Sequence, residues 1–400
     1  MPDSAASAAP AAPCFHGGAF FEAVGPGFDD LSRRHDVVNA DVLDAWFDPA
    51  PAVLDALAGH LPWLLRTSPP THAEGLVAAL CAARGLDPAT VVVGAGSSAL
   101  VFLALPRWLG AGQTALLLDP TYGEYAHVAR HVCGARVAWH TLRRDGGYRL
   151  DLDRWLADLR AAAPAVAVLV HPNNPTGSAA HADDLARALA AVPETTLVWV
   201  DEAYADYLSD AEASGADGSG APVVSMAPVA ARRRNVVVCR SLSKGLALSG
   251  VRAAYLVAHP ETAARLRGLT PPWAVGLPAQ VAAVAALTGS GAAAYYAARY
   301  AETHALRGDL ARSLAAVDPA FDVHAGAANA VLVHLPHGDS TGGPDAAALA
   351  RACRDRRLFV RDVAAMGPSV GRHLVRVAVK DAATQAVLTG RFADAWRDAA

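Results

Sequence analysis

Short runs of aliphatic and β-branched residues alternate with longer segments of helical period from about residue 90 onward. The runs are interrupted by Arg, Asp, Gly or Pro, and this alternation is typical of βαβ units. It predicts a large α/β domain whose mostly parallel, seven-stranded sheet is flanked by helices. We expect the strands at 91–93, 114–118, 136–140, 166–170, 197–200, 236–239 and 253–257. We expect helices between several of them, at 98–108, 124–131, 152–162 and 182–190.

The pattern changes after about residue 285. A long helix within 292–317 precedes the runs FDVHAG and NAVLVHL, a helix near 346–356, the runs RLFVRDV and HLVRVAVK, and a C-terminal helix. This order favours a smaller α+β domain. The predicted division is a leader and arm at 1–49 that joins the small domain, a large domain at 50–285 and a small domain at 286–400. The Gly/Ser/Asp-rich stretch at 209–222 is interpreted as a surface insertion.

Composition excludes several classes of function. Charged residues make up 18% of the chain, the net charge is −4 and the pI is about 6.4, so nothing points to nucleic acid or an anionic membrane. No apolar run approaches the roughly 20 residues of a membrane span. The Ala/Pro/Ser-rich start lacks the basic segment of a signal peptide, which favours the cytoplasm. Five separated cysteines and the fifteen histidines lack the spacing of disulfide frameworks or metal sites.

A lysine stands in apolar surroundings in the run VCRSLSKGLALSGVR at 238–252. Burial of an ammonium is unfavourable unless a partner compensates its charge or the charge is removed. Lys244 is preceded by Ser241 and Ser243 and is followed, eight residues later, by Arg252. Four further motifs fall at the carboxyl ends of predicted strands, where open α/β sheets bind ligands.

The first of these motifs is VVVGAGSSALVF, a strand followed by a Gly-rich turn and a helix. The amides near Gly96, Ser97 and Ser98 should face an anion at the helix N-terminus, which favours a cofactor phosphate. The same letters also fit a G-x-G-x-x-A dinucleotide fingerprint with Asp119 downstream. A purely structural tight turn is the third interpretation.

The other three motifs each present polar side chains at a strand end. In LDPTYGEY, Tyr122 is placed to stack on a planar ring or simply to pack. In HPNNPTGS, Pro and Gly force a turn that presents the Asn174 amide. In LVWVDEAYADY, a buried strand ends on Asp201, with Tyr204 one turn later. A carboxylate in that position is unfavourable unless a cation accompanies it.

Pyridoxal 5′-phosphate supplies the partner that each of these groups lacks. Its aldehyde would form a Schiff base with Lys244, which removes the uncompensated ammonium, and its pyridinium nitrogen would pair with Asp201. The serines, the arginine and the amides of the Gly-rich turn would hold the phosphate. Asn174 and Tyr204 would bind the ring oxygen, and Tyr122 would stack on the ring. The predicted cofactor-binding residues are Gly96, Ser97, Ser98, Tyr122, Asn174, Asp201, Tyr204, Ser241, Ser243, Lys244 and Arg252.

The S-x-S-K…R cluster, the NNPTG turn and the DEAY strand end resemble, in order and spacing over roughly residues 90–260, the class I/II aminotransferases of PLP fold type I. The resemblance implies that fold, that cofactor and a homodimer whose sites are completed by the neighbour. It is most marked with the histidinol-phosphate aminotransferase branch and its relatives that decarboxylate threonine phosphate. In that branch two arginines bind the anionic ends of the substrate, and Arg361 and Arg376 fall at those positions. Arg376 is expected to bind the α-carboxylate, and Arg361 either binds a second anion or forms an exposed salt bridge.

Three segments depart from that branch. VVNADVLDAWFDPAP, with Asp41, Asp44 and Trp46, replaces the usual Asn-Glu-Asn-Pro segment. LLRTSPPTHAEGL replaces the Arg-Tyr-Pro segment, so that Thr67 or Ser68 would take the place of a tyrosine that reaches the partner's cofactor, or the contact is lost. Two uncharged residues follow the Gly-rich turn where an acidic pair is common. These changes favour a specialised substrate or a reaction other than simple transamination.

The function predicted is an enzyme, an aminotransferase that moves an amino group between a small, anionic or specialised amino acid or amine and a 2-oxo acid. Lys244 would act as base and acid at Cα, with Asp201 and Tyr204 as the other catalytic residues. The alternative on the same scaffold is a PLP-dependent decarboxylase, or an elimination or cyclisation enzyme of secondary metabolism. A nicotinamide-dependent dehydrogenase would leave Lys244, Asp201 and Asn174 unexplained. A PLP-binding regulator would carry a DNA-binding segment, and none is visible.

Overall fold

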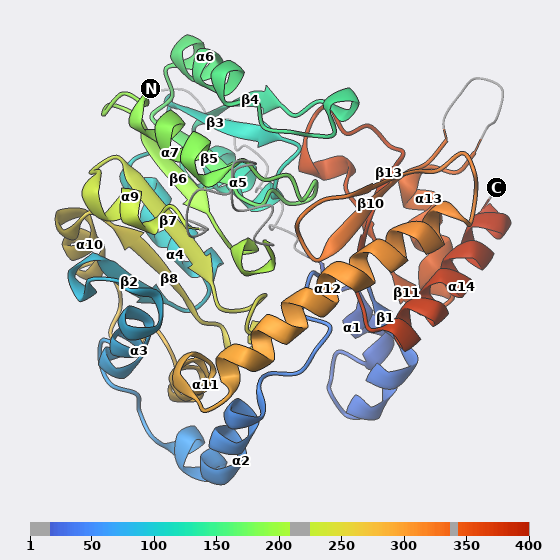
Figure 1. The fold of residues 1–400 in the computed structure, drawn as a ribbon, viewed down its shortest axis with the longest axis horizontal. Coiled ribbons are helices and arrows are strands. Elements are labelled where there is room, and N and C mark those ends of the chain that lie inside the picture. The colour runs from blue at the N-terminus through green and yellow to red at the C-terminus, as the bar shows by residue number, and fades with distance from the viewer. Residues whose placement is uncertain (1–16, 209–224, 337–342, 400) are drawn as a thin grey trace, which may run out of the picture.

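The computed structural model describes residues 17–208, 225–336 and 343–399 (Figure 1). The predicted insertion at 209–222 and the first 16 residues of the predicted leader and arm at 1–49 lie outside these ranges. Within them the chain forms three sheets, of seven, four and two strands.

The seven-stranded sheet is of the predicted kind. Its order is β2-β8-β7-β6-β5-β3-β4, with β8 antiparallel to both of its neighbours and the other pairs parallel. Nearly every position of six strands is buried, since helices cover both faces, and this is why these strands appear in the sequence as almost unbroken apolar runs. The edge strand β4 is mostly half-buried. The bounds, which overlap all seven predicted runs, are β2 Val91–Gly94, β3 Thr114–Asp119, β4 Arg136–Thr141, β5 Val166–Val170, β6 Leu197–Asp201, β7 Val236–Ser241 and β8 Ala254–Ala258.

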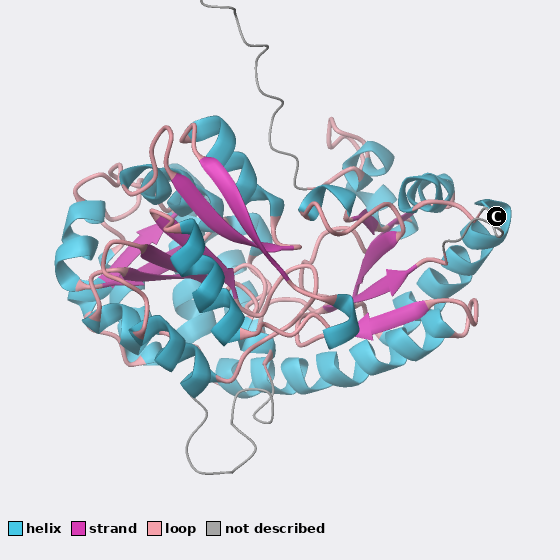
Figure 2. Ribbon diagram, turned by 90° about the horizontal axis from the view of Figure 1, so that it is seen from above, coloured by secondary structure: helices cyan, strands magenta, loops and turns pink. Residues whose placement is uncertain are grey.

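Helices pack around this sheet on both sides (Figure 2). Helices α6 (Leu152–Ala162) and α7 (Ala182–Ala190) have the predicted bounds. Helix α4 (Ser97–Ala104) ends before the predicted residue 108 in a 3-10 turn, because Pro106 has no amide to donate. Helix α5 (Gly123–His127) continues as a five-residue π-helical turn. The remaining helices of this half are α2 Pro51–Arg66, α3 Glu74–Arg84, α9 Ala227–Arg232, α10 Pro260–Arg267 and α11 Leu277–Thr288.

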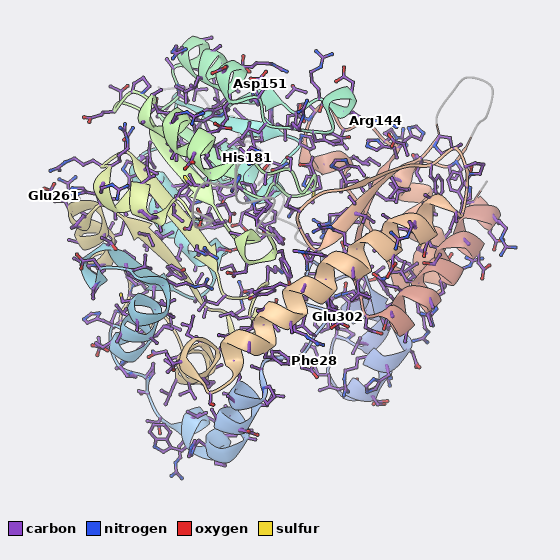
Figure 3. All side chains as sticks on the ribbon, in the orientation of Figure 1. Phe28, Arg144, Asp151, His181, Glu261 and Glu302 are labelled. Carbon is purple, nitrogen blue, oxygen red and sulfur yellow. The ribbon has the colours of Figure 1, made fainter. Side chains whose placement is uncertain are left out.

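A four-stranded antiparallel sheet forms the second half, in the order β12-β13-β10-β9. The 24-residue helix α12 (Ala292–Ala315) runs from the seven-stranded sheet to this smaller one (Figure 1). Between the two sheets, Arg144, labelled in Figure 3, donates to Asp322 of β9 at 2.6 Å. The remaining bounds are β9 Asp322–Ala325, β10 Ala330–His334, α13 Ala346–Asp355, β12 Arg361–Asp362, β13 Leu374–Ala378 and α14 Ala382–Ala399.

The N-terminal segment is attached to the smaller sheet. After helix α1 (Phe20–Val24), strand β1 (Val38–Asn39) pairs in parallel with β11 (Leu358–Phe359). The next residue, Ala40, donates to Phe359 at 2.8 Å and accepts from the amide of Ala378 in β13 at 3.0 Å. The domain boundaries at 49/50 and 285/286 stay a prediction.

The described helices were also compared with the length of a bilayer. No single one of them is long and apolar enough to cross it. Helices α11 and α12 reach the required length and composition only when taken together, and they are bent by 84° at the break.

Candidate active site

The carboxyl ends of the central parallel strands lie side by side at one edge of the large sheet. In the register, Val170 of β5 is opposite Asp201 of β6, which is opposite Cys239 of β7. The loops after these positions carry the predicted asparagine, tyrosine and lysine, and they leave the sheet at about the same level. This is the edge at which open α/β sheets bind ligands.

Lys244, three residues after β7, meets a carboxylate from the N-terminal segment. Its Nζ lies 3.1 Å from Asp44 Oδ1, and its side chain is 19% exposed. Burial lowers the pKa of Lys244, and the Asp44 charge opposes this effect. The main-chain carbonyl of Lys244 accepts from the Tyr207 hydroxyl at 2.8 Å, and that of Gly245 accepts from the Tyr300 hydroxyl at 3.1 Å. These two tyrosines fix the backbone of the lysine turn.

The Asp44 charge also acts on the second lysine of the chain. Only two of the 34 basic residues are lysines, Lys244 and Lys380. Burial lowers the pKa of Lys380, which follows β13, to about 8, against the opposing effect of Asp44. Burial raises the pKa of Asp44, but Lys244, a hydrogen bond from Ser249 and Lys380 outweigh burial, so this pKa is lowered. Asp44 is therefore an ionised carboxylate close to two amines.

Asp201 ends β6 as a buried carboxylate with neutral partners. Its Oδ2 accepts from the Tyr125 hydroxyl at 2.6 Å, and its Oδ1 accepts from the Ala203 amide at 2.9 Å. The Tyr125 oxygen in turn accepts from the Trp199 indole at 2.9 Å. Burial raises the pKa of Asp201 to about 6, although both hydrogen bonds oppose the shift. The charged form of Asp201 would be stabilised by a cationic group at this position.

Asn174, Tyr204 and Arg376 form a continuous polar chain. The Asn174 Nδ2 lies 3.5 Å from the Tyr204 hydroxyl oxygen, and its Oδ1 accepts from Arg376 Nη1 at 2.5 Å. Arg376 is 3% exposed, and its Nη2 donates to the main-chain carbonyl of Asp41 at 2.6 Å. Its Nε has no partner among the described residues. Burial lowers the pKa of Arg376 to about 10, so its guanidinium is charged at neutral pH and held by neutral acceptors.

Gly96 and Arg252 bring a guanidinium against the N-terminus of α4. Gly96 has a φ of +87°, and a Cβ on it would overlap Arg252 Nη2. Arg252 also donates to the carbonyl of Ser249 at 3.1 Å. Ser241 and Ser243 are both buried, and the Ser243 amide donates to the Ser241 hydroxyl at 3.2 Å. Unpaired amides and a guanidinium at a helix start form the kind of place where a phosphate binds.

A buried glutamate that the sequence reasoning missed connects two of the predicted residues. The Ser98 hydroxyl donates to Glu124 Oε2 at 2.8 Å, and the Tyr122 hydroxyl lies 3.4 Å from the same oxygen. Tyr122 also contacts Tyr125 edge to face, with ring centroids 6.1 Å apart. Tyr122 is thereby linked through Tyr125 to Asp201. The available signal was a carboxylate in the first turn of the predicted helix 124–131.

Arg361 has a carboxylate partner of its own. Its Nε lies 2.6 Å from Asp41 Oδ1, and the two side chains are 12% and 7% exposed. The sequence interpretation of Arg361 as an exposed salt bridge is therefore wrong in one respect, since the pair is buried. The two residues are brought together by the pairing of β1 with β11 and of β12 with β13.

Trp46, Thr67 and Ser68 were also singled out from the sequence, and no contact between them and the residues of the site is found among the described residues. Trp46 donates from its indole nitrogen to Thr303 of α12 at 2.8 Å, and Arg299 lies over its ring. Thr67 and Ser68 follow α2, on which the Thr67 backbone forms the C-terminal cap. Their predicted role toward a partner chain stays a prediction.

Comparison with known proteins gives one family. The model of the aminotransferase class I and II family matches residues 41–392. An aromatic amino acid aminotransferase of Cutibacterium acnes is 33% identical over 60% of this chain and 64% of its own length. Histidinol-phosphate aminotransferase 2 of Caulobacter vibrioides is 35% identical over 60% of this chain and 59% of its own. The chain thus spans about three-fifths of the length of these relatives.

Solved structures show the same fold. The histidinol-phosphate aminotransferase of Sinorhizobium meliloti, in complex with pyridoxal 5′-phosphate, superimposes with a TM-score of 0.75 over 91% of both chains, at 24% sequence identity. The expected α/β fold of type I is therefore confirmed.

Proposed function

Because the chain belongs to the aminotransferase class I and II family, we propose that it transfers an amino group between a small amino acid or amine and a 2-oxo acid, with pyridoxal 5′-phosphate as cofactor. One observation carries the proposal. At a single edge of the sheet a largely buried lysine, a buried carboxylate with neutral partners and an arginine at a helix N-terminus come together.

The described residues fit this cofactor. Asp201 accepts two neutral hydrogen bonds and has a raised pKa, so a protonated ring nitrogen would supply the cation that it lacks. The space over Gly96, which a Cβ would fill, adjoins the Arg252 guanidinium and the first amides of α4. A phosphate there would receive charge-assisted hydrogen bonds. The dinucleotide interpretation of the same turn has no comparable support.

The proposed mechanism assigns one task to each residue. When bound, the cofactor supplies a carbonyl for the substrate amine and a ring that withdraws electrons from Cα. Lys244 would be its point of attachment and, once displaced by the substrate, would move the Cα proton. The lowered pKa of Lys244 supports this, because a base must be neutral to accept a proton. Arg376 would bind the α-carboxylate through its guanidinium.

Asn174 and Tyr204 would orient the cofactor ring, because Asn174 is itself fixed by Arg376 at 2.5 Å. This contact also supports a coupling between the two halves of the site. An acid bound by Arg376 would alter the hydrogen bond to Asn174, and thus the environment of the Tyr204 hydroxyl, which lies 3.5 Å from the asparagine nitrogen.

The test separates amino transfer from the decarboxylation, elimination and cyclisation that the same scaffold would allow. The holoenzyme is incubated with a panel of amino acids, together with pyruvate or 2-oxoglutarate, and products are identified by mass spectrometry. Amino transfer gives equal amounts of a new 2-oxo acid and a new amino acid. When the added oxo acid is omitted, no new amino acid appears, and the new 2-oxo acid is limited to about one equivalent per enzyme. Product formation without an oxo acid, with release of carbon dioxide or loss of a leaving group, would identify a lyase instead.

A homodimer is the assembly that we propose. Several large apolar side chains of α2 are exposed, and a second copy of the chain would remove them from water. They are Leu54, Leu61, Trp63 and Leu65. Analytical ultracentrifugation of the protein and of a Leu65→Asp variant tests this. We expect a dimer for the first and a shift toward monomer for the second, and a monomeric unmodified protein would refute the proposal. The predicted cytoplasmic location stays a prediction.

A further inference from the structure

One aspartate contacts both arginines expected on the substrate side of the site. Arg361 of β12 and Arg376 of β13 are directly opposite each other in the antiparallel register. The Asp41 carboxylate lies 2.6 Å from Arg361 Nε, whereas Arg376 Nη2 donates to the main-chain carbonyl of the same residue at 2.6 Å. The Asp41 carboxylate therefore pairs directly with Arg361, whereas Arg376 is hydrogen-bonded to the main chain of Asp41 and receives only the longer-range effect of its charge.

The Asp41–Arg361 pair is enclosed by the chain itself. Both side chains are nearly buried, and the backbone at Gly17 closes over them. A Cβ at Gly17 would overlap Arg361 Nη2 and lie 2.8 Å from Asp41 Oδ2. A ligand anion that took the place of Asp41 on Arg361 would leave the Asp41 carboxylate buried without its cation, which is strongly unfavourable. The pair is therefore a fixed part of the site.

Lys380, the other cation on this side, is influenced by the Asp44 carboxylate, which itself contacts Lys244. The Asp44 charge raises the pKa of Lys380, whereas burial lowers it to about 8. Arg376 differs from Arg361, because its hydrogen-bond partners, Asn174 and the Asp41 carbonyl, are neutral. Among these described side chains, Arg376 is thus the cation at which a substrate anion would supply the missing negative charge.

We propose that Asp41 is a specificity-determining residue that restricts the substrates to amino acids and 2-oxo acids with a single anionic group, the α-carboxylate, and an uncharged side chain. The inference rests on the proposed function and narrows it. Phosphate esters and dicarboxylates are disfavoured, so pyruvate is a better amino acceptor than 2-oxoglutarate. Asp41 acts by occupying Arg361, which would otherwise attract a second anion.

Binding of unreactive acids tests this without catalysis. The probes are 3-phenylpropionate, which has one anionic group, and succinate and 3-phosphonopropionate, which have two. Dissociation constants for the holoenzyme are measured by calorimetry. The variants are Asp41→Asn, which removes the charge but keeps the main-chain contact to Arg376, and Asp41→Glu, which keeps the charge. Asp48→Asn is the matched control, because Asp48 is an exposed carboxylate of the same segment.

For the unmodified protein we expect 3-phenylpropionate to bind more tightly than either of the other two acids. Asp41→Asn should strengthen binding of 3-phosphonopropionate by at least about tenfold, the effect of one added charge-assisted hydrogen bond, with little change for 3-phenylpropionate. Asp41→Glu and Asp48→Asn should resemble the unmodified protein.

Tight binding of 3-phosphonopropionate by the unmodified protein, or no gain in Asp41→Asn, would overturn the role of Asp41 and leave the proposed function intact. If Asp41→Asn does not fold, the unmodified protein still tests the proposal. It should then prefer 3-phenylpropionate among the three acids and pyruvate over 2-oxoglutarate, and the opposite preferences would overturn the proposal. Failure of all three acids to bind, together with no amino transfer, would instead refute the proposed function.

Discussion

Lys244 Nζ lies 3.1 Å from Asp44 Oδ1, although 200 positions separate the two residues in the chain. The Asp44 charge raises the pKa of Lys244 and of Lys380, which burial alone would lower further. We therefore expect Asp44→Asn to lower the pKa of both lysines in the cofactor-free protein. The measurement is the rate at which an amine-specific reagent labels each lysine as a function of pH, read by mass spectrometry. Identical pH profiles for Asp44→Asn and the unmodified protein would contradict the pairing, and Asp48→Asn is the control.

Lys244→Ala should abolish the covalent attachment of the cofactor and lower the rate of amino transfer by about a thousandfold or more, the usual effect of losing a catalytic base and attachment point. Borohydride reduction followed by peptide mapping detects the attachment. Because the chain has two lysines, Lys380→Ala is the matched control and should keep a reducible adduct at Lys244. An adduct at Lys380 in the unmodified protein would contradict the assignment.

Asp201→Asn should stabilise the cofactor-free protein while weakening the binding of pyridoxal 5′-phosphate. The pKa of Asp201 is about 6 in the folded chain and 3.8 as the reference for the unfolded chain. The folded state therefore binds the extra proton between these values, and stability falls as pH rises from 3.8 to about 6.

The gain in the free energy of unfolding for Asp201→Asn should be on the order of 1–3 kcal/mol at pH 8 and should vanish near pH 4. Urea unfolding at the two pH values measures it. Cofactor affinity, from a spectroscopic titration, should fall at least about tenfold because the ring nitrogen loses its anionic partner. Equal affinity in Asn and Asp forms would show that Asp201 does not meet the cofactor.

Gly96→Ala should weaken phosphate binding, since the new Cβ would overlap the Arg252 guanidinium and Gly96 has a φ of +87°. We expect a loss of about 1–3 kcal/mol in stability from backbone strain. Equilibrium dialysis of the cofactor-free protein with inorganic phosphate should show at least about a tenfold loss of affinity, equivalent to about 1.4 kcal/mol. Gly390→Ala, at an exposed position of α14 with open space around it, should instead be neutral or slightly stabilising. Unchanged phosphate affinity in Gly96→Ala would refute the proposed phosphate site between Gly96, Arg252 and the N-terminus of α4.

The seven strands could be predicted because a strand that is buried on both faces requires a run of apolar residues, and turn residues bound each run in the sequence. The π-helical turn at Val128–Val132 could not be predicted, since it has the same apolar periodicity as the helix that it extends. Helix α4 was overestimated by four residues because its apolar period continues past Pro106. Here the missing amide of a proline overrides the pattern.

The candidate site was predictable where its residues stand in short motifs at strand ends. Lys244, Asp201 and Asn174 are of this kind, and the structure places them at or just after the ends of the neighbouring strands β7, β6 and β5. The charge pairs of Asp41 and Asp44 were not predictable, because each joins residues from opposite parts of the chain. Lys380 was missed because a lysine after a strand is usually solvated, whereas here burial lowers its pKa to about 8.

The attachment of the N-terminal segment to β11 and β13 also has a mechanical consequence. Ala40 is hydrogen-bonded to Phe359 and Ala378, so the neighbouring Asp41 is anchored to the same small sheet as Arg361 and Arg376. A rotation of the four-stranded sheet against the seven-stranded one would carry these three groups together as a rigid body, without changing the charges that a substrate meets. The Lys244–Asp44 contact joins that body to the large sheet. A closing movement of the two sheets would therefore change the distance between Lys244 Nζ and Asp44 Oδ1.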